Sequence, residues 1–406
     1  MSAGADVVVV GAGIIGLSAA WRLAQRGASV TVVDPAPGSG ASTVAAGMLA
    51  PVTEARIGEE PLLRLNHASL TRWPAFAAEL EEASGRRIGF RTDGTLMVGL
   101  DADDRAALDD LASRHRAMGL EVEPLRGREA RRLEPGLAPG VRAGLLAADE
   151  RSVDPAAVVA ALEVAAAGAG VALVRAPVAR LVLSPAGDRA TGVALGPPAP
   201  DGEGTGPGAP AAGDGRELAA GTVLLAAGAR SGFVPGLPDH VRPPVRPVRG
   251  EVVTLRQPTD DPLVTRTLRG IVHGSTIYLV PRDDGRVVVG ATQEERGWDT
   301  RPTAGGTYEL LRDALALVPG LDDAELVGVR AGLRPGSPDH LPIIGWTALD
   351  GLAVATGHFR NGILLTPVTA EAVAALLSGE PGPDEVRPCD PRRFTGGAVA
   401  TGAVGP

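Results

Sequence analysis

The chain has 406 residues and a formal net charge of −9, with 44% apolar and 21% charged residues. This length exceeds what a single hydrophobic core usually supports, so we expect two domains. The acidic balance argues against nucleic acid or an anionic membrane surface as the main partner and favours a small molecule.

All 39 basic residues are arginine, which removes any mechanism built on a Schiff-base or general-base lysine. The single cysteine, Cys389, cannot form an internal disulfide, and the six histidines are scattered without metal-ligand spacing. No stretch reaches the roughly 18 uninterrupted apolar residues of a membrane span. We therefore expect a soluble, cytoplasmic protein without a metal site.

The N-terminal stretch "DVVVVGAGIIGLSAAWRLAQRGASVTVVDP" predicts a strand, a helix and a second strand. Gly11, Gly13 and Gly16 form a G-x-G-x-x-G turn between strand and helix, where backbone N–H groups and the helix dipole favour a pyrophosphate. Asp34 ends the second strand, where a carboxylate suits ribose hydroxyls and repels a 2′-phosphate. We predict a dinucleotide site here rather than a purely structural turn, although the motif does not choose between NAD and FAD.

The middle of the chain predicts a helix, a hairpin and a loop in that order. Asp154 and Pro155 are typical of a helix start, and residues 178–195 read as a hairpin. Residues 196–215 contain almost no large apolar side chain and cannot offset chain entropy by burial. We therefore predict a disordered loop at 196–215.

From about residue 245 the pattern changes to short alternating strands separated by turns such as Asp284-Gly285. Alternation of this kind predicts an antiparallel sheet. Apolar periodicity then predicts a helix over 303–317 and a last helix over 363–377.

Two small-residue segments, 38–49 and 221–230, suit backbone that passes close to a flat ligand, although tight packing explains either equally well. With the N-terminal unit they resemble the FAD-dependent amino-acid oxidase superfamily, which contains D-amino-acid oxidase, sarcosine oxidase and glycine oxidase. The likeness is strongest to the bacterial glycine oxidases of thiamin biosynthesis. It is carried by "AAGMLAP" (45–51), "YLVPR" (278–282), "VVVGAT" (287–292), "AGLRPGSPDHLPIIG" (331–345) and "GHFRNGILLTP" (357–367).

The resemblance implies an α/β fold, in which a Rossmann-like FAD-binding domain is joined to a second, substrate-binding domain built on an antiparallel sheet. The FAD-binding domain is expected to be discontinuous, with residues 1–85, 150–243 and 332–393. The substrate-binding domain then takes residues 86–149 and 244–331, and residues 394–406 form a flexible tail.

The resemblance also implies the residues around the flavin. They lie in the glycine turn, at the ribose, along the second loop, at residue 178 through its backbone, after the buried strand at 221–226 and around the ring. In that order they are Gly11, Gly13, Ile14, Ile15, Gly16, Asp34, Pro35, Ser42, Thr43, Ala46, Gly47, Met48, Val178, Ala227, Gly228, His358, Phe359, Arg360, Asn361, Gly362, Ile363 and Leu364. Sarcosine oxidase binds its flavin through a cysteine and uses a lysine near the ring. This chain has no lysine, and Cys389 lies far from the flavin motifs, so we expect non-covalent FAD.

Substrate binding, by the same resemblance, falls to Arg334, Arg360, Tyr278 and Met48. A guanidinium and a phenol match the carboxylate of a small amino acid, whereas Met48 supplies an apolar wall. The structural alternatives are an ion pair for Arg334, contact with the flavin or a neighbouring acid for Arg360, and core packing for Tyr278 and Met48. We assign no catalytic base, because a neutral amine delivers hydride to the flavin unaided.

The expected reaction is oxidative deamination of glycine, sarcosine or D-alanine, with O2 as acceptor and imine or glyoxylate, ammonia and H2O2 as products. The expected role is the thiazole part of thiamin biosynthesis. The alternatives are a D-amino-acid oxidase or dehydrogenase of broader specificity, or a flavoprotein dehydrogenase that feeds quinone. The partners are then a small amino acid and O2, with neither nucleic acid nor membrane, and the relatives suggest a homo-oligomer.

Overall fold

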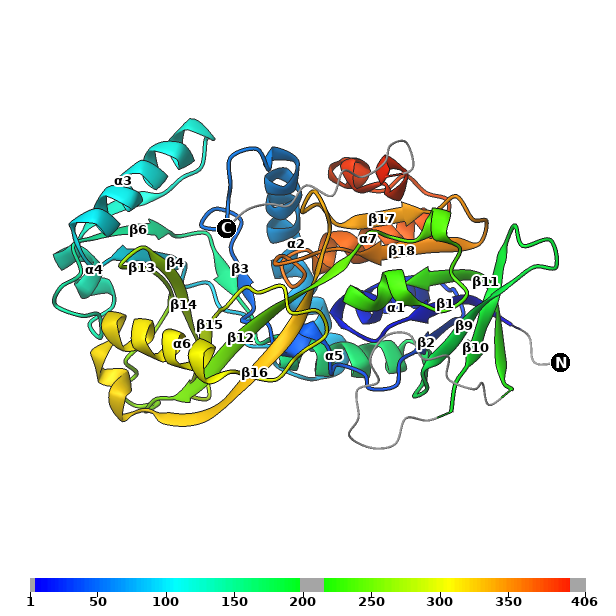
Figure 1. Cartoon of the computed structure of the whole chain (residues 1–406), viewed down its shortest axis with the longest axis horizontal. Coiled ribbons are helices and arrows are strands. Elements are labelled where there is room, and N and C mark those ends of the chain that lie inside the picture. Colours follow the sequence, from blue (N-terminus) through cyan, green and yellow to red (C-terminus); the bar gives the residue numbers. More distant parts are fainter. Residues whose placement is uncertain (1–3, 198–214, 395–406) are drawn as a thin grey trace.

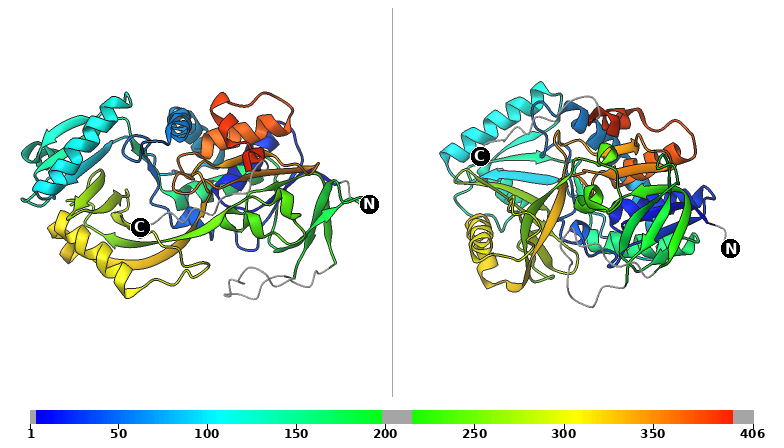
Figure 2. Two further views of the ribbon diagram at one scale, coloured as in Figure 1. Left: turned by 45° about the horizontal axis from the view of Figure 1, so that its top comes forward. Right: turned by 45° about the vertical axis from the view of Figure 1, so that its right-hand side comes forward.

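The computed structural model describes residues 4–197 and 215–394 and shows two lobes, each built around an eight-stranded sheet (Figures 1 and 2). Most of the predicted loop at 196–215 and nearly all of the predicted tail at 394–406 lie outside the described residues. Within the described ranges, no helix is both long and apolar enough to cross a membrane.

The first sheet has a parallel centre. Its strands run in the order β17 (Ile343–Trp346), β18 (Leu352–Thr356), β11 (Glu217–Leu225), β1 (Ala5–Val10), β2 (Val30–Val33) and β8 (Ala172–Val174), and the hairpin β9 (Val178–Leu183) and β10 (Ala190–Leu195) extends it through β11. All pairs from β18 to β8 are parallel, whereas β17 is antiparallel. The carboxyl ends of β1, β11 and β18 therefore meet at one edge, where open α/β sheets bind ligands.

The valine run of β1 is continuous because both faces of this sheet are covered. Val7 and Val9 join the core beneath the helices, and Val8 and Val10 join the core on the hairpin side. On the helical face, α1 (Ile14–Gln25) contacts α5 (Pro155–Gly168) and α7 (Thr366–Leu377). The long helix α2 (Glu60–Ser84) packs over α5 and α7 (Figure 1).

The second sheet carries the other lobe. Its strands run in the order β16 (Glu325–Gly336), β12 (Arg246–Arg256), β15 (Arg286–Gly290), β14 (Ser275–Pro281), β13 (Thr267–Val272), β4 (Thr95–Gly99), β6 (Ala143–Ala147) and β5 (Glu123–Arg126). The predicted antiparallel sheet is thus present, with one parallel pair between β4 and β13. Helices α6 (Ala304–Leu317), α3 (Ala102–Ala117) and α4 (Gly127–Leu133) pack against it. Outside both sheets, β3 (Met48–Leu49) pairs with β7 (Arg151–Ser152).

Two of the predicted helix starts are confirmed by their caps. The carboxylate of Asp154 accepts hydrogen bonds from the first N–H groups of α5, and the hydroxyl of Thr303 accepts one at the start of α6. The last helix, in contrast, begins at Thr366, three residues after the predicted start. Residues 362–365 form a turn instead, and Pro367 fits the first turn of α7 because it lacks the N–H that such a position leaves unpaired.

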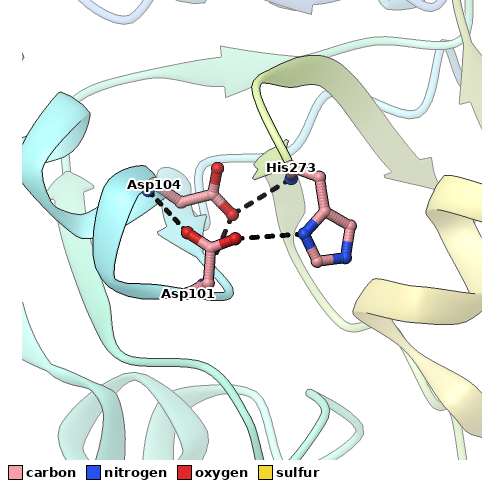
Figure 3. Close-up of side chains that lie close together, drawn as sticks. All are labelled: Asp101, Asp104 and His273. Atoms are coloured by element: carbon pink, nitrogen blue, oxygen red, sulfur yellow. Dashed lines mark hydrogen bonds and ion pairs between the residues drawn. The ribbon is translucent and has the colours of Figure 1, made fainter.

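One acidic cluster with a histidine joins α3 to the β13–β14 turn (Figure 3). Asp101 and Asp104 form a capping box, and Asp104 also accepts from the N–H groups of His273 and Gly274. The imidazole Nδ1 of His273 lies 3.0 Å from the Asp101 carboxylate. The carboxylate of Asp104 and one oxygen of Asp101 accept from backbone N–H groups, and these contacts connect the start of α3 to the β13–β14 turn.

The second sheet takes its strands from residues 95–147 and 246–336. The predicted boundary at 331/332 falls inside β16, so the strand that carries Arg334 belongs to this sheet along its whole length. The division of the chain into two domains at the predicted boundaries stays a prediction.

Candidate functional site

The glycine turn after β1 is so tight that side chains are excluded from it. Gly11 has φ 111°, and a Cβ there would lie 2.5 Å from the carbonyl oxygen of Ala226. A Cβ on Gly16 would lie 2.0 Å from the carbonyl oxygen of Gly11. The N-cap of α1, Gly13, provides no side-chain cap, and among the described residues the N–H groups of Gly13, Ile15 and Gly16 have no hydrogen-bond partner, so these three can donate to an anion.

The acid and hydroxyl expected at the nucleotide lie against this turn. The carboxylate of Asp34 accepts hydrogen bonds from the N–H groups of Ala12 at 2.7 Å and Ala36 at 2.8 Å. The hydroxyl of Ser42 accepts one from the N–H of Ile14 at 3.1 Å. The second loop is thus fixed next to the helix start, as a bound dinucleotide requires.

The other residues predicted on the nucleotide side line the same edge. Pro35 is exposed beside Asp34, and Val178 begins β9 and packs against the core that contains Val10 and Val33. Ala227 and Gly228 follow β11, where the carbonyl of Gly228 accepts a hydrogen bond of 2.9 Å from Thr356.

The second loop then turns towards the second sheet. Gly47 has φ 80°, and a Cβ there would lie 2.1 Å from the carbonyl oxygen of Val153. The carbonyl of Ala46 accepts a hydrogen bond from Arg282 at 2.5 Å. Ala46 and Met48 share an apolar cluster with Tyr278, so the predicted cofactor loop contacts the predicted substrate strand.

The C-terminal turn at 358–365 presents unpaired backbone donors. Within the described part of the chain, the N–H groups of Gly362, Ile363 and Leu364 form no hydrogen bond. The carbonyl of Leu364 is held from behind by the indole of Trp73 at 2.8 Å and the hydroxyl of Ser69 at 2.6 Å. Such a rigid row of donors suits a group that carries negative charge.

The histidine that begins this turn is buried and neutral. Burial lowers the pKa of His358 to about 3, and its Nε2 lies 3.0 Å from the hydroxyl of Thr369. The neighbouring residue Phe359 has φ 48°, and its ring stacks on His340. The Nδ1 of His340 lies 2.7 Å from the carboxylate of Glu59. Both histidines are therefore held by structural contacts.

The side chains of Arg334 and Tyr278 lie on one face of the second sheet, and each lies over a glycine of a neighbouring strand. A Cβ on Gly250 would lie 2.1 Å from the Nη1 of Arg334, and a Cβ on Gly290 would lie 2.4 Å from the hydroxyl of Tyr278. The Arg334 guanidinium donates to the carbonyls of Arg249 at 3.3 Å and Thr292 at 3.2 Å. The two glycines thus make room for a guanidinium and a phenol side by side on the sheet.

The phenol of Tyr278 stays protonated in this position. Burial raises its pKa in spite of the positive charge of Arg334 nearby. A protonated phenol can donate a hydrogen bond to a carboxylate oxygen. Arg334 and Tyr278 together therefore provide hydrogen-bond donors for an anion.

Arg360 approaches the same site from the C-terminal turn. Its side chain is 16% exposed, its Nε has no hydrogen-bond partner, and its ion pair with Glu59 is long at 3.9 Å. Burial lowers the pKa of its guanidinium. A buried guanidinium with unused donors costs free energy unless a ligand accepts from it.

The two halves of the site are joined through the backbone. The N–H of Phe359 donates to the carbonyl of Pro335 at 3.0 Å, and Gly336 forms a bridge with His358. Arg334 is thus the direct neighbour of Pro335, whose carbonyl is hydrogen-bonded to the C-terminal turn. Met48 packs in one cluster with Tyr278, and Arg334 and Arg360 both lower the pKa of the Glu54 carboxyl, so the structure brings these residues into one region.

Sequence reasoning missed four residues of this region. Glu54 and Arg269 form an ion pair of 2.6 Å beside Tyr278, and no motif singles them out. Gly250 and Gly290 stand inside predicted strands, where glycine is unfavourable. Those two glycines could have indicated the site, because a glycine inside a strand often marks a position where another group approaches the backbone closely.

The donor set fits a flavin dinucleotide. The glycine turn offers N–H groups that suit a pyrophosphate, Asp34 follows β2 and contacts that turn, and the N–H groups of residues 362–364 have no hydrogen-bond partner among the described residues. No lysine competes for a covalent or charge role there.

Comparison with known proteins agrees with this fit. The family model for FAD dependent oxidoreductases matches residues 6–376. Glycine oxidase of Geobacillus kaustophilus is 34% identical over 92% of this chain and 92% of its own. The bifunctional protein ThiO/ThiG of Synechocystis sp. is 32% identical over 97% of this chain, which spans only 55% of that longer protein.

Solved structures show the same similarity. The crystal structure of the Geobacillus kaustophilus glycine oxidase superposes with a TM-score of 0.82 at 32% identity, over 95% of this chain and 98% of the other. Iminodiacetate oxidase from Chelativorans sp. superposes with a TM-score of 0.80 at 28% identity, over 95% of this chain and 98% of the other. The chain therefore belongs to the family of FAD-dependent oxidoreductases, and FAD is its cofactor.

Proposed function

We propose that the protein catalyses the oxidative deamination of glycine and of small amines such as sarcosine and D-alanine. The observation that carries this proposal is the pairing of Arg334 with Tyr278 above two bare glycines, next to the predicted flavin loop. A small amino acid has one strong handle, its carboxylate, and a guanidinium with a phenol matches it. The glycine oxidases among the relatives support the choice of substrate.

The residues divide the work as follows. Arg334, Tyr278 and Arg360 bind the substrate carboxylate and thereby fix Cα, while Met48 forms an apolar wall that excludes water. When bound, FAD accepts a hydride from Cα and returns the electrons to O2 as H2O2. The N–H groups of residues 362–364 would help to hold the flavin and would stabilise negative charge on it.

The substrate nitrogen provides the electron pair that makes the C=N bond when the Cα–H bond breaks. Water then hydrolyses the imine to glyoxylate and ammonia. No side-chain base is needed for the hydride transfer, and the neutral His358 points to Thr369 instead. The remaining residues predicted at the cofactor are proposed to hold FAD without a covalent bond.

Further parts of the proposal concern the cellular setting. The similarity to proteins named ThiO/ThiG supports a role in the thiazole part of thiamin biosynthesis. A cytoplasmic location, independence of membranes and nucleic acid, and a homo-oligomeric state stay predictions.

The test is H2O2 production by the purified yellow protein with glycine, sarcosine and D-alanine. We expect peroxide from glycine, and catalase provides the control for its identity. Bleaching of the flavin by an amino acid without peroxide in air would support a dehydrogenase instead. If none of the three amines bleaches the flavin or yields peroxide, the proposed reaction is wrong.

A further inference from the structure

A carboxylate lies at the predicted substrate site without a role in the proposed chemistry. Glu54 follows β3 in the segment that leads to α2, and its side chain is 14% exposed. Its Oε1 lies 2.6 Å from the Nη1 of Arg269, which is 18% exposed. The preceding N–H groups of Val52 and Thr53 donate to the buried carboxylate of Glu150, so the position of Glu54 is fixed.

Arg269 continues the row of polar side chains on the second sheet. It stands directly opposite Tyr278 in the β13–β14 pair, and Tyr278 stands opposite Gly290 in the β14–β15 pair. Residues directly opposite each other share one face of a sheet. Arg269, Tyr278 and Arg334 therefore lie on the face where the substrate carboxylate is proposed to bind.

Glu54 is charged in this setting. Burial pushes the pKa of its carboxyl upward, but the positive charges of Arg269, Arg360 and Arg334 outweigh burial and hold the pKa below its usual range. Besides Glu59, whose carboxylate lies 3.9 Å from Arg360, the free protein thus already contains the Glu54 anion among three guanidinium groups. That anion occupies Arg269 and leaves Arg334 and Arg360 for the ligand.

We propose that Glu54 is a specificity-determining residue that restricts the pocket to amines with a single carboxylate. A second carboxylate on the substrate would have to displace Glu54 from Arg269 or lie unpaired beside it. Both alternatives place two negative charges close together in a partly buried site, which is strongly unfavourable. The inference rests on the proposed binding of the substrate carboxylate by Arg334 and Tyr278.

The test compares two unreactive ligands, methoxyacetate and oxydiacetate. They share one ether skeleton, differ by one carboxylate, and contain no nitrogen, so neither can form an imine. Isothermal titration calorimetry of the FAD-loaded protein gives both affinities without turnover. We expect the wild type to bind methoxyacetate more tightly, and glycine to compete with it.

The variant Glu54→Gln removes the charge and keeps the shape. We expect it to raise the affinity for oxydiacetate relative to methoxyacetate by at least about tenfold, because like charges at an interface cost several kcal/mol. The double variant Glu54→Gln/Arg269→Gln is expected to lose this gain, because the cation for the second carboxylate is then absent. Glu79→Gln breaks a 2.5 Å ion pair with Arg22 outside the region and is expected to keep the wild-type ratio.

Each outcome bears on a different claim. An unchanged ratio in Glu54→Gln, or a wild type that already binds oxydiacetate more tightly, overturns the role of Glu54. The wild-type measurement can overturn the role even if Glu54→Gln fails to fold. If the wild type binds neither ligand, the carboxylate site itself is misplaced, and the peroxide assay shows whether the proposed reaction fails with it.

Discussion

Arg334 shows how a strand can hold an arginine ready for an anion. Its Nη1 is fixed by two backbone carbonyls, which leaves the remaining donors of the fork for a ligand. Arg360, in contrast, has a buried Nε without a partner. The two guanidiniums therefore differ in how strongly the protein alone positions them, and Arg334 is the better anchor.

We predict that Arg334→Lys raises KM for glycine although the charge is kept. An ammonium is a point charge and cannot form the two parallel hydrogen bonds of a guanidinium. Complete removal in Arg334→Ala is expected to weaken substrate binding by about 2–5 kcal/mol. Steady-state peroxide assays measure both values.

The matched control for this prediction is Arg256→Lys, at the exposed end of β12, where the arginine pairs with Glu325 at 3.2 Å. This variant is expected to keep the wild-type KM. A wild-type KM in Arg334→Lys would mean that Arg334 does not bind the carboxylate.

At the residue scale, the sequence indicated Arg334, Arg360 and Tyr278 only through motifs that resemble known oxidases. Glu54 and Arg269 were not predicted, because they come together only when β13 pairs with β14 and the segment after β3 folds over the sheet. A single sequence contains no local pattern for such a long-range ion pair.

Among the elements, the β12–β16 pair is the most consequential for the site. It runs from Arg246 opposite Gly336 to Arg256 opposite Glu325, with a register shift between Thr254 and Leu255. Gly250 lies in the middle of β12, so the side chain of Arg334 can cross it towards Tyr278. Here a residue that weakens a strand is required by its neighbour.

We predict that Gly250→Ala raises KM for glycine by about tenfold or more. The new methyl group would lie 2.1 Å from the Nη1 of Arg334, so the guanidinium must leave its position. A shift of about 1 Å at a positioning group is enough to cost about a hundredfold in rate. Steady-state kinetics and a thermal melt of the same sample separate this effect from misfolding.

The control is Gly328→Ala on the paired strand, where an added Cβ has no atom within 4 Å. Kinetics like those of the wild type are expected for it. Equal KM values in both alanine variants would show that Gly250 does not make room for Arg334.

Secondary structure was largely predictable at the element scale. Asp154 and Thr303 marked two helix starts because their side chains cap the first turns. The start of α7 was predicted three residues too early, because the apolar residues 363–365 continue the helical pattern into a turn. The spacing of apolar residues alone cannot distinguish such a turn from the first turn of a helix.

For the whole molecule, buried neutral histidine sets a lower limit to the stable pH range. The pKa of His358 falls to about 3 on burial, against 6.5 for an exposed histidine. Below about pH 6.5 the unfolded chain binds a proton at this residue that the folded protein does not bind. The free energy of unfolding therefore falls as the pH is lowered from about 6.5 to about 3, by up to about 1.4 kcal/mol per pH unit.

We predict that His358→Gln flattens this loss. Between about pH 7.5 and about pH 5 the wild type should lose about 2 kcal/mol more stability than the variant. Denaturant unfolding at several pH values measures the difference. The control His240→Gln replaces an exposed histidine and should follow the wild type. Parallel curves for wild type and His358→Gln would refute the buried neutral imidazole.

The two-lobed architecture was expected from chain length and family resemblance, and the two sheets follow that expectation. The sequence could not indicate which backbone contacts join the two lobes. The hydrogen bond from Phe359 to Pro335 and the bridge between Gly336 and His358 join backbone to backbone.

These backbone contacts limit how the proposed substrate site can be redesigned. Arg334, proposed to bind the substrate, and the turn proposed to face the flavin are joined by these backbone contacts, so a shift of one is expected to move the other. Changes of substrate range are therefore best made by exchanging side chains on this frame. If this part of the backbone is replaced by that of a relative, residues 334–361 have to be exchanged together.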